Sequence, residues 1–183
     1  MRTRALAAAA CLALSACSRK EGPAMSAKPQ PGMALYEEPN RLFTCAVPAA
    51  WRVLEGQGGA QRVSFYGPSN GPKPYSAEIS VYHYPPGSAY ASPEDYALAQ
   101  RASGARASPL AERTWKGGKA YAFTTERMSP AGHGVLTPER RREETVLIAS
   151  KSGLLALVHS APAGREAETA TVFSAFLESL RPL

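Results

Sequence analysis

One apolar segment near the C-terminus limits the possible folds more than any other part of the chain. Residues 144–151 and 154–161 alternate as β-strands do and flank Ser152 and Gly153, which predicts a hairpin. Apolar side chains would occupy both of its faces, with Val146, Ile148, Leu155 and Leu157 on one and Leu147, Ala149, Leu154, Ala156 and Val158 on the other. Because neither face is polar enough to meet water, the hairpin must lie inside a sheet that is covered on both sides.

Two helices are predicted, and they can supply these covers. In the last segment, mostly apolar side chains recur at helical spacing and form a stripe of Thr169, Val172, Phe173, Phe176, Leu177 and Leu180. The other helix should run over residues 92–103. Ser92 suits the N-terminal cap, Pro93 suits the first helical position, and Gly104 is a typical stop.

The remaining elements are predicted to be strands. Four runs in the first half, separated by Gly, Pro and Asn, should form a meander at residues 41–47, 51–54, 61–66 and 77–84. A second hairpin is predicted from 110–116 and 119–127, because Gly117 and Gly118 can take positive φ in a tight turn. The fold class is therefore α+β, a mostly antiparallel sheet sandwiched between helices in a single domain, residues 36–183.

The order of these elements resembles that of the PsbP-like family. The shared features are an opening strand with Phe43, a second strand introduced by Pro48 and Trp51, a capped helix in mid-chain, two glycine hairpins and a terminal helix ending in Leu-Glu-Ser-Leu. The resemblance would cover residues 36–183 and implies an α/β/α sandwich. It also implies a non-enzymatic accessory domain that docks on a larger assembly through variable loops, so it assigns no site residue.

The N-terminus has the pattern of an export signal, with Arg2 and Arg4 ahead of an apolar run. The run is about 12 residues long, whereas a membrane-spanning helix needs about 20, so it cannot remain as an anchor. Leu-Ser-Ala-Cys at residues 14–17 resembles the lipobox of bacterial lipoproteins, in which the signal is cut before the cysteine and the thiol carries a diacylglycerol. We expect a signal peptide at residues 1–16 and lipid on Cys17.

An ordinary secretory signal is the alternative to lipidation, and it also implies export. By resemblance to the sorting rule of enteric bacteria, Ser18 after the lipidated cysteine favours the outer membrane over the inner one. Residues 17–35 are rich in Pro and Gly and poor in apolar side chains, which is typical of a flexible tether.

The distribution of charge argues against a nucleic-acid partner. Without Arg2 and Arg4, 19 of the 21 Lys and Arg remain against 15 Asp and Glu, and they are interspersed along the chain. The exception is a run of three arginines at residues 140–142. Glu143 and Glu144 follow it directly, which favours a solvated strand end with self-neutralising charges. The alternative is a partner-binding loop that contains His133, Arg140, Arg141 and Arg142.

No catalytic, cofactor or metal site is predicted. Ser69 lies in a Gly-x-Ser-x-Gly match, but Pro72 and Pro74 prevent the helix that a nucleophile elbow needs, so we expect a turn. His83 and His159 continue apolar strand faces and should be core residues. Cys45 should be buried as well, with no partner for an internal disulfide because Cys11 leaves with the signal and Cys17 carries lipid.

Two functions follow. The leading one is an envelope-anchored lipoprotein facing the periplasm, held by the lipid on Cys17. It acts as a non-enzymatic accessory or protein-docking module that binds its partner through loops near residues 67–75 and 128–142. The alternative is a periplasmic small-ligand or metal-binding protein, or a weak hydrolase, that uses His133 and Ser69. A deep pocket with converging polar groups would favour the alternative, and a filled sandwich would favour the docking module.

Overall fold

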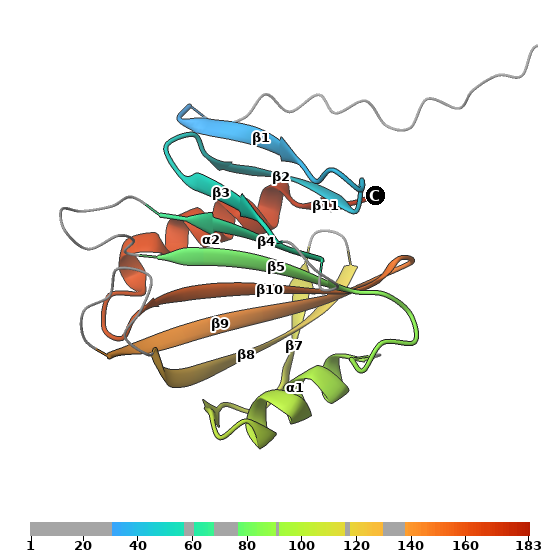
Figure 1. Ribbon diagram of the computed structural model, residues 1–183, viewed down its shortest axis with the longest axis vertical. Coiled ribbons are helices and arrows are strands. Elements are labelled where there is room, and N and C mark those ends of the chain that lie inside the picture. The colour runs from blue at the N-terminus through green and yellow to red at the C-terminus, as the bar shows by residue number, and fades with distance from the viewer. Residues whose placement is uncertain (1–30, 57–60, 68–76, 91, 116–117, 130–137) are drawn as a thin grey trace, which may run out of the picture.

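The computed structural model describes residues 31–56, 61–67, 77–90, 92–115, 118–129 and 138–183 (Figure 1). The predicted signal peptide and most of the predicted tether lie outside the described residues. In chain order the elements are β1 (Met33–Glu37), β2 (Phe43–Pro48), β3 (Arg52–Glu55), β4 (Gln61–Tyr66), β5 (Glu78–Tyr84), α1 (Pro93–Ala102), β6 (Arg106–Ala107), β7 (Ala111–Trp115), β8 (Gly118–Ser129), β9 (Glu139–Ser150), β10 (Gly153–Pro162), α2 (Ala167–Ser179) and β11 (Arg181–Pro182).

The strands form two antiparallel sheets instead of one. The large sheet has eight strands in the order β3-β4-β5-β10-β9-β8-β6, with β7 also paired to β8, and the small sheet has the order β1-β2-β11. The predicted meander is confirmed for β3, β4 and β5, which pair in succession. It is wrong for the opening strand, because β2 pairs with β1 and with the C-terminal β11. β1 begins at Met33, so residues 33–35 of the predicted tether belong to a strand.

The β9–β10 hairpin lies in the middle of the large sheet, as predicted, and is buried on both faces. Val146, Ile148, Leu155 and Leu157 are buried in one core cluster, and Leu147, Leu154 and Ala156 are buried in the other. Ala149, near the end of β9, is exposed although the pattern predicted it to be buried. The turn residues are Lys151 and Ser152, one position earlier than predicted, because Ser150 pairs with Gly153.

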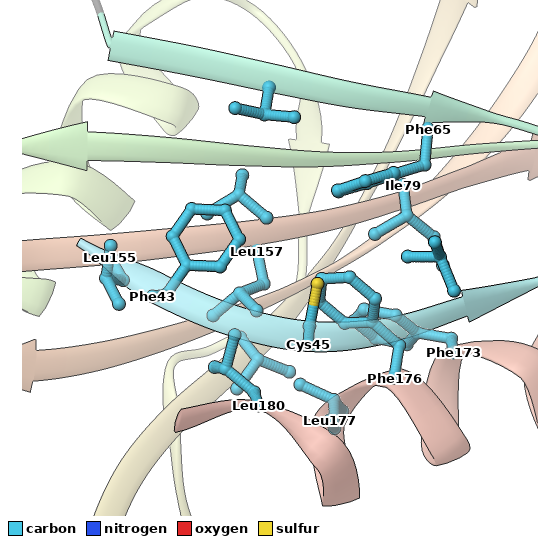
Figure 2. Packing of buried hydrophobic residues seen from close by; sticks show 14 of the residues in the cluster. Phe43, Cys45, Phe65, Ile79, Leu155, Leu157, Phe173, Phe176, Leu177 and Leu180 are labelled. Atoms are coloured by element: carbon cyan, nitrogen blue, oxygen red, sulfur yellow. The ribbon is translucent and has the colours of Figure 1, made fainter. Parts of the chain in front are cut away.

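α2 and the small sheet together cover one face of the large sheet. The predicted stripe on the last helix is confirmed, because Phe173, Phe176 and Leu177 are buried, as is Leu180 just after the helix. These side chains meet residues from both sheets, as Figure 2 shows for Phe43, Cys45, Phe65, Ile79, Leu155 and Leu157. The ring of Phe176 lies 5.6 Å from that of Phe65, centroid to centroid.

α1 covers the opposite face at the β8–β9 side of the sheet, where Tyr96 and Ala97 pack in the second core cluster with Phe123. The predicted cap is confirmed, because the Ser92 hydroxyl accepts a hydrogen bond from the Asp95 N–H at 3.1 Å. The arrangement of a sheet between helices is therefore confirmed only in part, since a second sheet supplies some of the cover beside α2. None of the helices in the described residues is long and apolar enough to cross a membrane.

Candidate docking surface at the end of the β8–β9 pair

The end of the β8–β9 pair extends past β6 and β7 on the β8 side, while β10 accompanies β9 as far as Arg141. β6 pairs with β8 only at residues 125–126, and β7 pairs with it at residues 118–122. Residues 127–129 therefore pair with β9 alone, within the part of the chain that the structure describes. We call residues 126–129 and 139–142 the arm.

Strand alternation divides the arm into two faces. Cα pairing sets Arg127 opposite Arg141, and it sets Met128 opposite Arg140. Because directly paired residues share a face and neighbours along a strand alternate, Arg140 and Arg142 lie on the face of Met128, and Arg141 lies on the other. The predicted arginine triplet is thus split between the two faces.

Arg141 is held by the protein itself. Its Nε donates to the Ser160 hydroxyl at 3.0 Å, its Nη2 donates to the Ser160 carbonyl oxygen at 2.9 Å, and its Nη1 forms an ion pair with Glu139 at 3.2 Å. The side chain is only 14% exposed. These bonds fasten the start of β9 to β10, which is a structural role.

The two acidic residues after the triplet are neutralised by arginines from other strands. Glu143 pairs with Arg127 and also accepts a hydrogen bond from Thr125 at 3.2 Å. Glu144 pairs with Arg113 at 2.7 Å. The predicted self-neutralisation of this strand end is therefore wrong, because Glu143 and Glu144 pair with Arg127 and Arg113 and not with the triplet.

Met128, Arg140 and Arg142 are exposed together, and we call these three residues the cationic face. Met128 is 58% exposed. Neither arginine forms an ion pair with any described residue, whereas seven other cations do, namely Arg41, Arg62, Arg113, Lys119, Arg127, Arg141 and Arg165. Glu126 is partly exposed and is paired across the strands with Arg142.

A second acidic residue close enough to interact with Arg142 lies at the start of α2. Backbone N–H groups of Glu166 and Gly164 lower the pKa of the Glu166 carboxyl, and Arg142 adds to that effect. Met128 was not predicted to be a site residue. Its position two residues beyond Glu126 in an alternating strand, which puts both side chains on one face, was the signal available in the sequence.

A shallow hollow of about 150 Å³ lies at the other side of the molecule, lined by residues that include Glu38, Asn40, Glu55 and Arg62. Its polar groups are already bonded within the protein. The Glu38 carboxylate accepts from Asn40 at 2.9 Å and from the Leu42 N–H at 3.2 Å, and Arg62 is paired with Glu78 at 2.6 Å. Glu55 accepts a hydrogen bond from the Tyr36 hydroxyl at 2.9 Å.

The two described histidines are core residues, as predicted. His83 is buried, with Nδ1 2.5 Å from the Gln61 Oε1 and Nε2 2.8 Å from the Ser152 carbonyl oxygen. His159 is buried with its Nε2 2.8 Å from the Thr169 hydroxyl. Among the described residues, no three His, Cys, Asp or Glu side chains are grouped so that they could hold a metal ion.

The other candidate residues from the sequence separate into two groups. Cys17, Ser69 and His133 lie outside the described residues. Cys45 is fully buried as predicted, and burial raises the pKa of its thiol. A thiol in this state is a poor nucleophile.

No protein-family model matches the chain, and no curated protein matches its sequence. Solved structures do resemble its fold. Cyanobacterial PsbP (CyanoP) from Synechocystis sp. PCC 6803 superimposes with a TM-score of 0.55 at 16% identity, over 88% of this chain and 100% of that one. The Ran-binding protein Mog1p of Saccharomyces cerevisiae superimposes with a TM-score of 0.52 at 10% identity, over 82% of this chain and 95% of that one.

A longer protein from Bacteroides thetaiotaomicron VPI-5482 also resembles the chain, with a TM-score of 0.52 at 13% identity. The match covers 83% of this chain but 49% of that one, so the chain spans about half the length of that relative. The likeness to PsbP and Mog1p supports the predicted PsbP-like fold. At these identities, the comparisons show the fold alone.

Proposed function

We propose that this chain is an envelope-anchored, non-enzymatic docking module that binds an acidic surface of a partner protein through the cationic face of the arm. The observation that carries the proposal is the exposure of Met128 beside Arg140 and Arg142, two arginines that form no ion pair with any described acidic residue. Arg and Met are both enriched at protein–protein interfaces relative to the rest of the surface.

The chemistry of the three side chains fits a protein better than a small ligand. Met is flexible and polarisable, so it adapts to an irregular apolar surface. Arginine presents a planar fork of donors that matches a carboxylate, and it loses less hydration than lysine when it is covered. The cationic face lies on paired strands, which hold it in a fixed geometry.

The proposed location follows from the N-terminal sequence. A diacylglycerol on Cys17, with further acyl chains, would hold the chain at the membrane on the periplasmic side, the outer membrane being favoured by Ser18. The name of Mog1p records a protein ligand for one member of this fold. That precedent supports protein docking as a use of the same architecture.

Site-specific crosslinking in the chain's own bacterium tests the proposal. A photoreactive amino acid placed at Met128 should give one discrete protein adduct, and the same group at Leu98, which is 65% exposed on α1, should not. The double substitution Arg140→Glu, Arg142→Glu should reduce the Met128 adduct at least about tenfold, which corresponds to a loss of about 1.4 kcal/mol in binding.

The matched control is Lys151→Glu, which reverses the charge of an exposed lysine in the β9–β10 turn, at the opposite end of β9 from the arm. It should leave the adduct unchanged. Equal adducts from positions 128 and 98, or an adduct that survives reversal of both arginines, would show that the cationic face is not the docking surface.

A further inference from the structure

Exposed apolar side chains gather at the end of the molecule opposite the arm. Six large apolar residues are exposed among those described, and four of them belong to the small sheet, its C-terminal extension or the neighbouring edge strand β3: Leu35, Val53, Leu54 and Leu183. Leu183 is placed there because its N–H donates to the Leu42 carbonyl oxygen at 3.0 Å. The small sheet and β3 lie together at one edge of the large sheet in Figure 1.

The outer face of the small sheet continues this apolar surface. Tyr36 and Cys45 are paired and point into the core. Leu35 and its cross-strand partner Ala46 therefore point outward, as do Met33 and its partner Pro48. Leu35 is 54% exposed, and the other three are partly exposed. We call this outer face, together with Val53, Leu54 and Leu183, the apolar end.

We propose that the apolar end rests on the surface of the lipid bilayer, an inference that relies on the lipid anchor of the proposed function. The tether enters the domain at this end, because the described chain begins just before Met33. The composition of residues 18–32 predicts a flexible tether, for which the expected average span is roughly 20 Å at about 5–6 Å times the square root of the length. The lipid on Cys17 thus keeps the apolar end near the bilayer.

Because the lipid on Cys17 would hold the domain near the bilayer, even a weak contact between the apolar end and the lipid would be formed much of the time. A short flexible linker raises the effective concentration of the second contact to the millimolar range, so a few partly inserted apolar side chains suffice. Charged residues border the apolar end, with Arg41 and Glu37 forming an exposed ion pair at 3.9 Å. An apolar centre with a charged border suits the boundary between headgroups and acyl chains.

A second copy of the chain fits this surface less well. β3 has only four residues, and Val53 and Leu54 point to opposite faces of the sheet. Pairing of two β3 strands would therefore bury far less than the roughly 800 Å² per partner of a standard interface. A bilayer that meets the sheet edge-on can contact side chains on both faces of the edge strand β3 and on the small sheet at once.

Lipid-dependent fluorescence quenching tests the inference on the full lipidated protein, reconstituted in vesicles of phosphatidylethanolamine and phosphatidylglycerol with a nitroxide-labelled lipid. Single cysteines at Leu35 or Leu54 carry an environment-sensitive dye, and Leu98→Cys is the matched control on α1. Cys45 does not label because it is fully buried. We expect quenching at positions 35 and 54 to be at least twice that at position 98.

Flotation of the same vesicles separates the two proposals. If the protein floats and positions 35, 54 and 98 are quenched equally, the anchor stands and the resting orientation is overturned. If the dye at position 35 is shielded from water but not quenched by the nitroxide, another protein molecule covers the surface, and the inference is again overturned. If the protein does not float, the lipid anchor fails and the inference fails with it.

Discussion

At the scale of single residues, His159 ties the stability of the fold to pH. The side chain is 3% exposed, and its ring stacks on that of Phe173 at 5.0 Å between α2 and the sheet. Burial lowers the pKa of the imidazole. Glu144 and Glu166 raise it by less, and Arg141 lowers it further. The folded protein therefore holds His159 neutral in conditions where an unfolded chain would protonate it.

We predict that the free energy of unfolding falls as the pH is lowered from 7.5 to 5.5. Below the unfolded pKa of about 6.5, the unfolded chain binds a proton that folded His159 does not, so acid favours unfolding. In His159→Gln this drop should be smaller, as measured by thermal unfolding at both pH values. Thr169→Val removes the hydrogen-bond partner but keeps the imidazole, so it should retain the pH dependence. An undiminished drop in His159→Gln would contradict the account.

For the residues of the arm, some side-chain positions could have been predicted from the sequence and others could not. Alternation along a strand was enough to place Arg140 and Arg142 on one face, had the strand been predicted to begin at Glu139. The ties of Arg141 to Ser160 were not accessible, because they depend on the register between β9 and β10. The same holds for the pairing of Glu143 with Arg127, which lies on another strand.

At the scale of elements, the two hairpins provide a matched pair of glycines. Gly118 and Gly153 each begin a strand with positive φ, 125° and 131°. A Cβ at Gly153 would lie 2.1 Å from the Tyr84 carbonyl oxygen, whereas a Cβ at Gly118 would have no atom within 4 Å. Position 153 therefore needs glycine for both its backbone angle and its lack of a side chain, and position 118 needs glycine for the backbone angle alone.

Gly118→Ala should lower the free energy of unfolding by about 1–3 kcal/mol, the cost of an unfavourable backbone angle. Gly153→Ala should lower it by more than about 4 kcal/mol, because β5 and β10 must also move apart. Urea denaturation of both variants measures the difference. Similar losses at the two positions would mean that the close approach of Tyr84 to Gly153 has no energetic consequence.

The elements that the sequence predicted well are those whose pattern is local. The stripe on α2, the cap at Ser92 and the two-sided hairpin each depend on spacing within one segment. The small sheet was missed because its strands come from both ends of the domain. Met33–Leu35 follows a run rich in Pro and Gly, and β11 has only two residues, so neither had a recognisable strand pattern.

At the scale of the whole molecule, the two proposed surfaces lie towards opposite edges of the large sheet, the apolar end at β3 and the adjoining small sheet and the cationic face on β8 and β9. β3 and β8 are separated by five strand spacings of about 4.8 Å, roughly 24 Å in total. α2 and the small sheet are joined in one core, with β2 and α2 contributing to the same cluster. A domain that rests on the bilayer by its apolar end would therefore hold the cationic face away from it, where a partner can reach the arm.

This arrangement depends on Cys17, and replacing the anchor tests it. In a variant with residues 1–16 exchanged for an ordinary cleavable secretory signal and with Cys17→Ala, we expect the protein to move from the membrane fraction to the soluble fraction of the envelope. Its unfolding transition should not change, because 15 residues separate Cys17 from the first described strand. The intact mass of the unaltered mature protein should show a lipid-bearing residue 17 at its N-terminus.

The same variant also separates anchoring from docking. If the cationic face binds its partner directly, the purified soluble variant should still form the Met128 adduct with that partner in solution. The yield should fall in cells, because the anchor no longer confines the two proteins to one surface. Should the variant remain with the membranes at its original level, the lipid on Cys17 would not be what holds the chain there, and the orientation proposed for the apolar end would lose its basis.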